Sequence, residues 1–354
     1  MKKILAYIAA ALALLGAGIS CKDGEETIDS YSNAKLAFDA WMLLHHPELT
    51  ALEEGGIFPV QDIPGTGETV KEDDYVFVKY CIRSLEDSAY LDYNEADIAR
   101  KMRAYDKTYY YGPEVILLSE GSASQGWMDT FFGKEGVLDT MRVGGYRETV
   151  APGWLGSTSS YYDTKAEYIA NCSGTNSIIN VRVTDRTQDI NQWQIDSILR
   201  TGRVTPADSC LGHAGKLFYK RNLERELQRK VTRGTDTLPS DTTIYVNYIG
   251  RLIDGTVFDT NIKDTAKVWG LYDSSSSYTP QSVAFSSDST ALTLGGSTTI
   301  DGFSLTIFRM HAFESGTGIF VSDYGYGYSG SGYSIPAYAP LIFEIDIVEK
   351  PDSE

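Results

Sequence analysis

The alternation of apolar and polar positions predicts β-strands at four places in the chain. Residues 243–248 alternate as a strand with one buried face does, and residues 74–80 and 178–183 resemble that pattern. Residues 341–348 form a more continuously apolar run. We therefore expect these four runs to pair into antiparallel sheets.

Two other runs, 34–44 and 191–200, place apolar residues at helical spacing. Each precedes a group of the predicted strands, so we interpret them as connecting helices that pack on their neighbours. The span 260–291 is rich in Ser, Asp and Thr. This composition indicates an inserted, solvated loop there.

The two halves of the chain also contain related runs. Gly126-Trp127 resembles Gly302-Phe303, and residues 138–150 resemble the helix end and strand that follow the second pair. Residues 178–183 resemble 341–348. Such self-similarity predicts two copies of one β-rich unit, in a chain long enough to hold two cores.

The first twenty residues have the layout of a secretory signal, with Lys2 and Lys3 before an apolar run. Gly18-Ile19-Ser20-Cys21 is similar to a bacterial lipobox, in which the cysteine is diacylated. Residues 22–26 resemble a lysine-then-acidic tag that sends some Gram-negative lipoproteins to the outer face of the outer membrane. We expect a lipid anchor on Cys21 and a surface-exposed protein in the cell envelope. An ordinary cleaved signal is the alternative.

Charge and cysteine content narrow the range of functions and bonds that we expect. Without Lys2 and Lys3 the chain has 29 basic and 48 acidic residues, a net charge of −19. Such a surface repels phosphate backbones, which argues against nucleic-acid binding. Three cysteines remain beside Cys21. Because this number is odd, at most one disulfide is possible among Cys81, Cys172 and Cys210.

The second half resembles the FKBP-type peptidyl-prolyl isomerase family. Val246-Asn-Tyr-Ile-Gly-Arg-Leu-Ile-Asp-Gly-Thr-Val-Phe-Asp259 follows the family signature, and residues 299–327 and 334–345 are similar to its later blocks. The resemblance implies an α+β fold in which a curved antiparallel sheet wraps a short helix. It also implies a proline pocket between sheet and helix.

The resemblance assigns residues to that pocket. Its walls would be Tyr248, Phe258, Tyr326 and Phe343, with Phe303 on the floor and Ile335 near the rim. Asp259 would sit among the aromatic rings, and the main-chain N–H of Ile300 would face the substrate carbonyl. Thr299 replaces an apolar residue of the family and makes the rim more polar. A further aromatic wall has no clear counterpart, and Phe285 is a candidate. The tyrosine-rich run 324–333 would arch over the pocket, with no assigned role for Tyr324, Tyr328, Tyr333 and Tyr338.

A pocket of this kind suits rotation about an X–Pro bond. The barrier comes from amide resonance, about 18–20 kcal/mol, and no bond is broken. A dry aromatic cavity disfavours the planar, charge-separated form, and a main-chain donor holds the twisted carbonyl. No metal or nucleotide cofactor is expected. The adjacent His45 and His46 point to different faces of a helix and are interpreted as a solvated helix end.

We therefore expect a signal peptide at 1–20, a tether and helix at 21–54 and a degenerate FKBP-like domain at 55–186. A connecting helix at 187–212 and an isomerase domain at 213–354 would follow. In the first unit Tyr80 and Tyr90 stand for wall aromatics, and either Leu91 falls at the aspartate position or Asp92 replaces it through a one-residue slip. The predicted function is isomerisation or folding assistance on proline-containing segments of exported proteins. A non-catalytic surface binding or assembly module is the main alternative, and carbohydrate binding is a weaker one.

Overall fold

The structure is a computed structural model of the chain. It describes residues 30–49, 57–118, 136–155, 164, 167, 171, 174–235, 237–286, 288 and 292–351. The predicted signal peptide, the lipidation site Cys21, Trp127 and Cys172 lie outside these residues.

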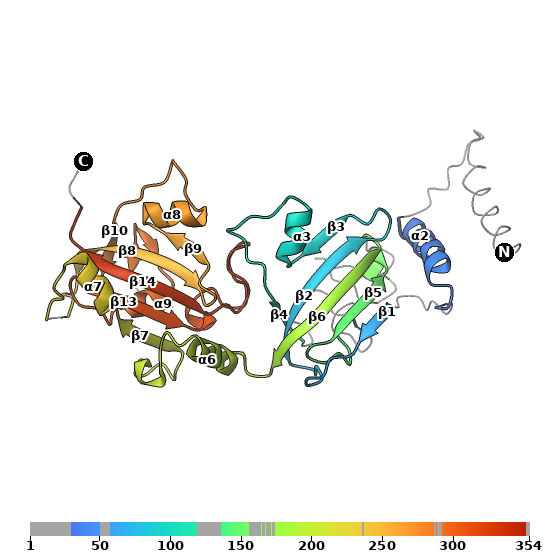
Figure 1. Cartoon of the computed structure of the whole chain (residues 1–354), viewed down its shortest axis with the longest axis horizontal. Coiled ribbons are helices and arrows are strands. Elements are labelled where there is room, and N and C mark those ends of the chain that lie inside the picture. The colour runs from blue at the N-terminus through green and yellow to red at the C-terminus, as the bar shows by residue number, and fades with distance from the viewer. Residues whose placement is uncertain are drawn as a thin grey trace, which may run out of the picture.

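The first domain is built on a six-stranded antiparallel sheet (Figure 1). Its strand order is β1-β5-β6-β2-β3, and β4 also pairs with β2. The strands are β1 Phe58–Ile63, β2 Tyr75–Ser84, β3 Tyr90–Tyr93, β4 Glu114–Leu117, β5 Tyr146–Ala151 and β6 Ser177–Thr187. The predicted strands at 74–80 and 178–183 are confirmed as parts of β2 and β6, which pair with each other.

The second domain is built on an eight-stranded sheet in the order β12-β11-β10-β8-β14-β13-β7, with β9 also on β8. The strands are β7 Leu217–Arg221, β8 Thr242–Leu252, β9 Val257–Thr260, β10 Gln281–Phe285, β11 Thr293–Leu294, β12 Ser297–Thr298, β13 Ser315–Phe320 and β14 Leu341–Val348. The predicted strands at 243–248 and 341–348 are central here, because β8 and β14 pair along their length.

Both sheets have one topology. The path β1-β5-β6-β2-β4 of the first domain corresponds to β7-β13-β14-β8-β10 of the second, and β3 corresponds to β9. With few helices and antiparallel sheets, the chain has the predicted α+β fold of two FKBP-like domains. Each domain has its own buried apolar cluster on one face of its sheet.

Six α-helices lie in the described part of the chain: α2 Ser30–His45, α3 Ala96–Lys101, α6 Ile190–Arg200, α7 Leu223–Arg229, α8 Lys263–Trp269 and α9 Asp301–Ile307. The two predicted connecting helices are confirmed as α2 and α6. The helix α2 buries Phe38 and Met42 against Trp154 of the first domain. Asp189 is the N-cap of α6, and its side chain accepts a 2.9 Å hydrogen bond from the N–H of Gln192.

The helix α6 occupies the junction of the two domains (Figure 1). Ile198 packs with Phe218 and Ile342 on the outer face of the second sheet. On its other side, the Trp193 ring lies 4.1 Å from the ring of Phe77 in β2 of the first domain. One helix therefore contacts both sheets.

The span expected to be an inserted loop contains regular structure instead. Residues 263–269 form α8, and residues 281–285 form β10, which pairs with β8 from Gln281↔Val246 to Phe285↔Thr242. The prediction of a solvated loop over 260–291 is thus wrong for these two elements. Their sequences are short and rich in Ser and Asp, so they carry weak periodic signals.

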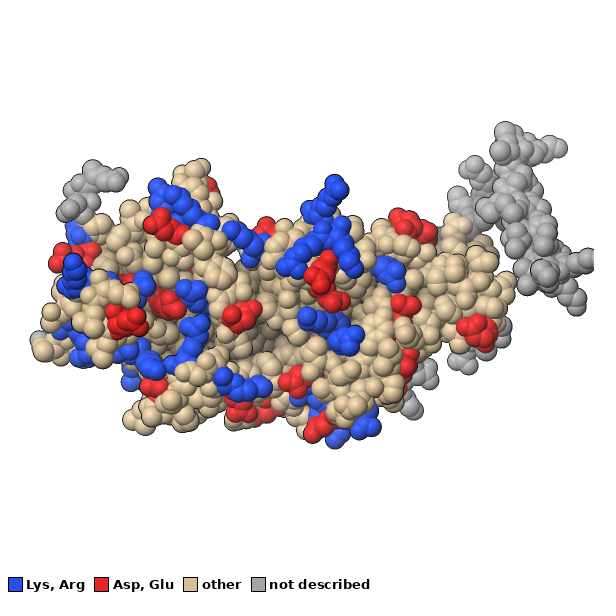
Figure 2. Space-filling view, in the orientation of Figure 1, with Lys and Arg blue, Asp and Glu red and all other residues tan. Residues whose placement is uncertain are grey.

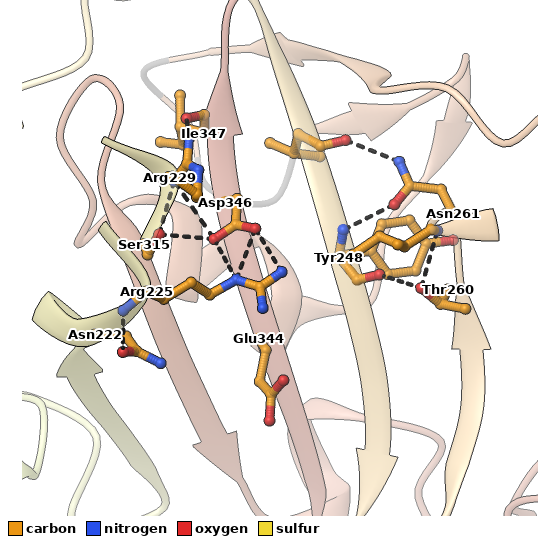
Figure 3. Close-up of polar contacts among 12 residues, drawn as sticks. Asn222, Arg225, Arg229, Tyr248, Thr260, Asn261, Ser315, Glu344, Asp346 and Ile347 are labelled. Carbon is orange, nitrogen blue, oxygen red and sulfur yellow. Dashed lines mark hydrogen bonds and ion pairs between the residues drawn. The ribbon is translucent and has the colours of Figure 1, made fainter. Parts of the chain in front are cut away.

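A buried ionic cluster holds α7 on the outer face of the second sheet (Figure 3). Asp346 lies between the core residues Ile345 and Ile347 in β14. Its side chain, which is 4% exposed, therefore points to the opposite face of the sheet. Its carboxylate accepts hydrogen bonds of 2.8 Å from Arg225 Nε and 2.7 Å from the Ser315 hydroxyl, and Arg229 Nη1 lies 3.4 Å away. The carboxylate is thereby paired and hydrogen-bonded.

Side chains of both signs are spread over the face shown in Figure 2, without one dominating patch. No helix among the described residues is both long and apolar enough to cross a bilayer. Cys81 and Cys210 are buried free thiols, so a disulfide between them is ruled out, and burial raises the pKa of Cys81 to about 11.

Candidate active site

Four aromatic rings from four elements meet on the inner face of the second sheet. Tyr248 of β8 lies 5.8 Å from Phe303 of α9 and 6.3 Å from Phe343 of β14, measured between ring centroids. Phe343 lies 5.3 Å from Phe303 and 5.7 Å from Phe258 of β9, both edge to face. This edge-to-face geometry is favourable for aromatic pairs and makes a preformed apolar surface.

A glycine in β8 makes room for these rings. A Cβ atom on Gly250 would lie 2.7 Å from the Phe258 ring and 3.2 Å from the Phe343 ring. Those distances are shorter than carbon–carbon contacts allow, so any larger residue at position 250 displaces an aromatic wall. The glycine is required here by close approach.

A tyrosine–aspartate pair adds polar groups to the aromatic surface. The Tyr248 hydroxyl donates a 2.9 Å hydrogen bond to Asp259 Oδ2. Desolvation by the surrounding protein raises the pKa of Asp259, even though its side chain reaches solvent at the mouth of the site. Partial burial, and then the charge of Asp259, raise the pKa of Tyr326.

The strand β9 is locked in register by Asn261 and Thr260 (Figure 3). The buried Asn261 side chain accepts a 2.8 Å hydrogen bond from Tyr248 N–H and donates one of 2.9 Å to the Val246 carbonyl. The Thr260 hydroxyl donates to the Tyr248 carbonyl at 2.7 Å. These bonds fix Asp259 opposite Gly250.

The start of α9 supplies the main-chain donor that the sequence pointed to. Ile300 is the N-cap of α9 with an extended backbone, and no acceptor among the described residues lies on its N–H. The Thr299 hydroxyl is turned to the helix start, where it donates to the Leu292 carbonyl at 3.3 Å and contacts the Ser304 hydroxyl. Phe303 is 2% exposed and lies beneath the rings of Tyr248 and Phe343.

The tyrosine-rich loop joins the site to the first domain. Tyr326 is 37% exposed, whereas Ile335, expected near the rim, is 4% exposed and packs in the core with Tyr248 and Phe343. Of the tyrosines without an assigned role, Tyr333 stacks on Tyr109 of the first domain at 4.7 Å. Tyr338 meets Tyr75 edge to face at 5.1 Å, and Tyr324 contacts His213 through a 3.1 Å hydrogen bond. Tyr328 and Tyr333 are both largely exposed, at 76% and 74%, and Tyr333 keeps its ring contact with Tyr109.

The structure does not place Phe285 at the site. Phe285 pairs with Thr242 at the far end of β10 and stacks on Phe308 at 5.0 Å. The β10 residue nearest Tyr248 in register is Gln281, opposite Val246. The predicted extra aromatic wall is therefore absent at this register position, which holds an amide.

The first domain has the same polar arrangement with a one-residue slip. Tyr80 donates a 3.1 Å hydrogen bond to Asp92 Oδ2, and Asn94 accepts from Tyr80 N–H at 2.8 Å, as Asn261 does from Tyr248. The pairing Ile82↔Asp92 corresponds to Gly250↔Asp259, so Asp92 takes the aspartate position through the slip. Leu91 lies at the bulge that Phe258 occupies, and Tyr90 corresponds to Val257. Tyr90 is thus not a wall aromatic.

A second shared motif was missed in the sequence. Asp106 N–H donates to the Tyr111 hydroxyl at 3.2 Å, and Asp273 N–H donates to the Tyr278 hydroxyl at 2.8 Å. In both domains the ring of the preceding tyrosine stacks on that tyrosine at 5.3 Å. The signal was the spacing Tyr-Asp, then Tyr five residues after the Asp, then Pro two residues later, present at 105–113 and 272–280.

Nothing in the described residues groups three or more His, Cys, Asp or Glu side chains in a geometry for a metal ion. His45 and His46 have separate local partners, the Trp41 carbonyl and the Glu48 carboxylate. The site consists of aromatic rings, one carboxyl and one main-chain donor.

Comparison with known proteins shows what the second domain is similar to. Residues 234–348 match the family model of the FKBP-type peptidyl-prolyl cis-trans isomerases. No curated protein matches the sequence. A crystal structure of the three FKBP domains of wheat FKBP73 is 17% identical, and the match covers 83% of this chain and 94% of that one with a TM-score of 0.27.

Two bacterial structures are also similar. A peptidyl-prolyl cis-trans isomerase of Pseudomonas syringae pv. tomato is 20% identical, over 45% of this chain and 92% of that one, with a TM-score of 0.30. FkpA from Escherichia coli is 19% identical, over 45% of this chain and 58% of that one, with a TM-score of 0.30.

Proposed function

Residues 234–348 belong to the FKBP-type peptidyl-prolyl cis-trans isomerase family, and on this premise we propose that the second domain isomerises prolyl bonds in extended protein segments. The observation that carries the proposal is the Tyr248–Asp259 hydrogen bond of 2.9 Å beside the rings of Phe258, Phe303 and Phe343. The first domain has Leu91 at the position of Phe258 and so lacks this aromatic wall, which supports assigning turnover to the second domain alone.

The geometry supports a mechanism without covalent chemistry. A proline ring against Phe303 and Phe343 loses water from its imide, which disfavours the planar form with its separated charges. The free N–H of Ile300 then holds one end of the segment by its carbonyl oxygen. Tyr326 contributes a hydroxyl donor at the mouth, and donors that bind the twisted carbonyl more tightly than the planar one lower the barrier.

A protease-coupled assay on an uncharged prolyl peptide tests the proposal. Tyr326→Phe should lower kcat/KM about tenfold, the factor that loss of about 1.4 kcal/mol of transition-state stabilisation produces. Tyr328→Phe is the matched control, because it removes a hydroxyl from the exposed part of the same loop. Turnover at the uncatalysed rate, with prolyl-peptide binding retained, would instead establish a non-catalytic binding module.

We also propose that the protein acts on exported proteins in the cell envelope, anchored to the outer membrane through a lipid on Cys21. The support is the lipobox-like run Gly18–Cys21 and the lysine-then-acidic residues that follow it. Labelled palmitate should enter the wild-type protein and not Cys21→Ser. Equal labelling of both would contradict the anchor without touching the isomerase proposal.

A further inference from the structure

A cavity of about 690 Å³ lies between the two domains and is lined by residues of both. One wall comes from the first domain and includes Tyr80, Asp92 and Glu114, and the other comes from the tyrosine-rich loop of the second domain, with Tyr333 and Pro336. Its volume lies in the range of sites that take a small molecule or a few residues of a chain.

The first-domain wall is the surface that carries the isomerase site in the second domain. Tyr80 and Asp92 correspond to Tyr248 and Asp259, with hydrogen bonds of 3.1 and 2.9 Å. The supporting asparagine is also kept, since Asn94 donates to the Val78 carbonyl at 2.9 Å. The cavity therefore lies at the place in the first domain that corresponds to the candidate active site of the second.

The chemistry of this wall differs from that of the second domain. Glu114 in β4 pairs with Val78 of β2. The equivalent residue of the second domain is Gln281 in β10, which pairs with Val246 of β8. A second carboxylate thus stands where the other domain has a neutral amide. The Tyr80 hydroxyl is 3.1 Å from Asp92 and 3.4 Å from Glu114, and its single proton serves only one of them at a time.

The two carboxylates have no cationic partner on the cavity wall, because none of the residues that line it is Lys or Arg. Desolvation, and then the Asp92 charge, raise the pKa of Glu114. The titratable groups that face Glu114 are Asp92 on β3, Tyr80 on β2 and Tyr110 on the loop before β4. A cation in this cavity would therefore offset the repulsion between the two carboxylates.

Aromatic rings complete the wall. Tyr93, Tyr109, Tyr111 and Tyr333 all line the cavity. Tyrosine faces attract ammonium and guanidinium groups, and they also cover the methylene stem of a long basic side chain. The chain as a whole has a net charge of −17, which adds long-range attraction for basic partners.

We propose that the interdomain cavity is a second binding site, for a lysine or arginine side chain of an extended protein segment. The ammonium or guanidinium group pairs with Asp92 and Glu114, and the stem lies on the tyrosine rings. The site needs neither proline nor turnover, so it stands independently of the proposed isomerase function.

Calorimetric titration of the full chain with two proline-free peptides tests the site. The probes are acetyl-Ala-Lys-Ala-amide and its norleucine counterpart, which keeps the stem and lacks the charge. The lysine peptide should bind about tenfold more tightly at low salt. Asp92→Asn combined with Glu114→Gln should remove this difference. The control Asp241→Asn combined with Asp264→Asn makes the same charge change at exposed positions and should keep it.

A pH series on the wild-type protein gives a second readout that needs no variant. Because the pKa of Glu114 is raised above 4.5 by desolvation and by Asp92, binding of a cation beside it releases a proton. The affinity for the lysine peptide should rise with pH above that value, and that for the norleucine peptide should stay constant. Equal affinity of the two peptides, equal loss in both double variants, or a pH-independent lysine affinity would overturn the proposal. The Asp92/Glu114 double variant should turn over the uncharged prolyl peptide at the wild-type rate. This measurement distinguishes failure of the cation-site proposal from failure of the isomerase proposal.

Discussion

The main-chain N–H of Tyr110 in the first domain donates a 2.7 Å hydrogen bond to the carbonyl of Tyr333 in the second. Because Tyr333 belongs to the loop that carries Tyr326, this bond ties the mouth of the candidate active site to the neighbouring domain. The stacked rings of Tyr109 and Tyr333 lie beside it. The first domain thereby restrains a loop of the second.

This restraint predicts faster hydrogen exchange in the loop when the stack is removed. Tyr109→Ala should cost about 0.5–1.5 kcal/mol of aromatic pairing, so amides of residues 329–338 should exchange up to about tenfold faster. Tyr272→Ala is the control, since it breaks the stack on Tyr278 inside the second domain. Unchanged exchange in Tyr109→Ala would show that the main-chain bond alone holds the loop.

The tight approach at Gly250 predicts a coupled pair of substitutions. Gly250→Ala should destabilise the second domain by about 1–3 kcal/mol, because the new methyl group overlaps the Phe258 ring. Adding Phe258→Leu should recover part of that loss, since the first domain has Ile82 and Leu91 at these two positions. Urea unfolding of the single and double variants measures the coupling. Strictly additive losses would contradict the proposed overlap.

The Asp346 cluster predicts that removing two carboxylates of the same strand, Asp346 and Glu344, lowers the free energy of unfolding by very different amounts. Asp346→Ala should cost about 3 kcal/mol, because Arg225 and Arg229 are left partly buried without their partner. Glu344→Ala, which removes a more exposed pair with Arg251, should cost about 0–1 kcal/mol. Chemical denaturation at fixed pH compares the two. Similar losses would mean that the buried pair contributes no more than the exposed one.

The raised pKa of Asp259 predicts a pH-dependent gain from a neutral substitute. A folded-state pKa above 3.8 means that the folded chain holds the proton more tightly, so stability is lost as pH rises from 3.8 through the folded pKa. Asp259→Asn escapes this loss while retaining an acceptor for Tyr248. Its unfolding midpoint should exceed that of the wild type near about pH 7, and the gap should close in acid. A gap that widens in acid would contradict the direction of the shift.

The strands and the main aromatic residues could be predicted because their signals are local. Residues 341–348 form a nearly continuous apolar run. Tyr248, Phe258 and Asp259 lie in one stretch that follows the family signature without a gap. The first-domain aspartate could not be decided in the same way. Whether Leu91 or Asp92 faces Tyr80 depends on a bulge in β3, and a one-residue slip reverses which side chain faces inward.

The contacts between domains lay beyond local pattern. Tyr333 and Tyr338 find partners in Tyr109 and Tyr75, which are more than two hundred residues away in the chain. The strand β10 was also hidden, because Gln281 and Ser282 interrupt its alternation and its stability comes from pairing with β8.

The motif shared by residues 105–113 and 272–280 shows that both domains use the same framework around the tyrosine–aspartate pair. Both copies keep the same hydrogen bond, the same stacked tyrosines and the same proline before β4 or β10. The segment that leads into β4 or β10 is therefore one structural element used in both domains. Glu114 and Leu91 in the first domain, and Gln281 and Phe258 in the second, therefore give one framework two chemically different surfaces.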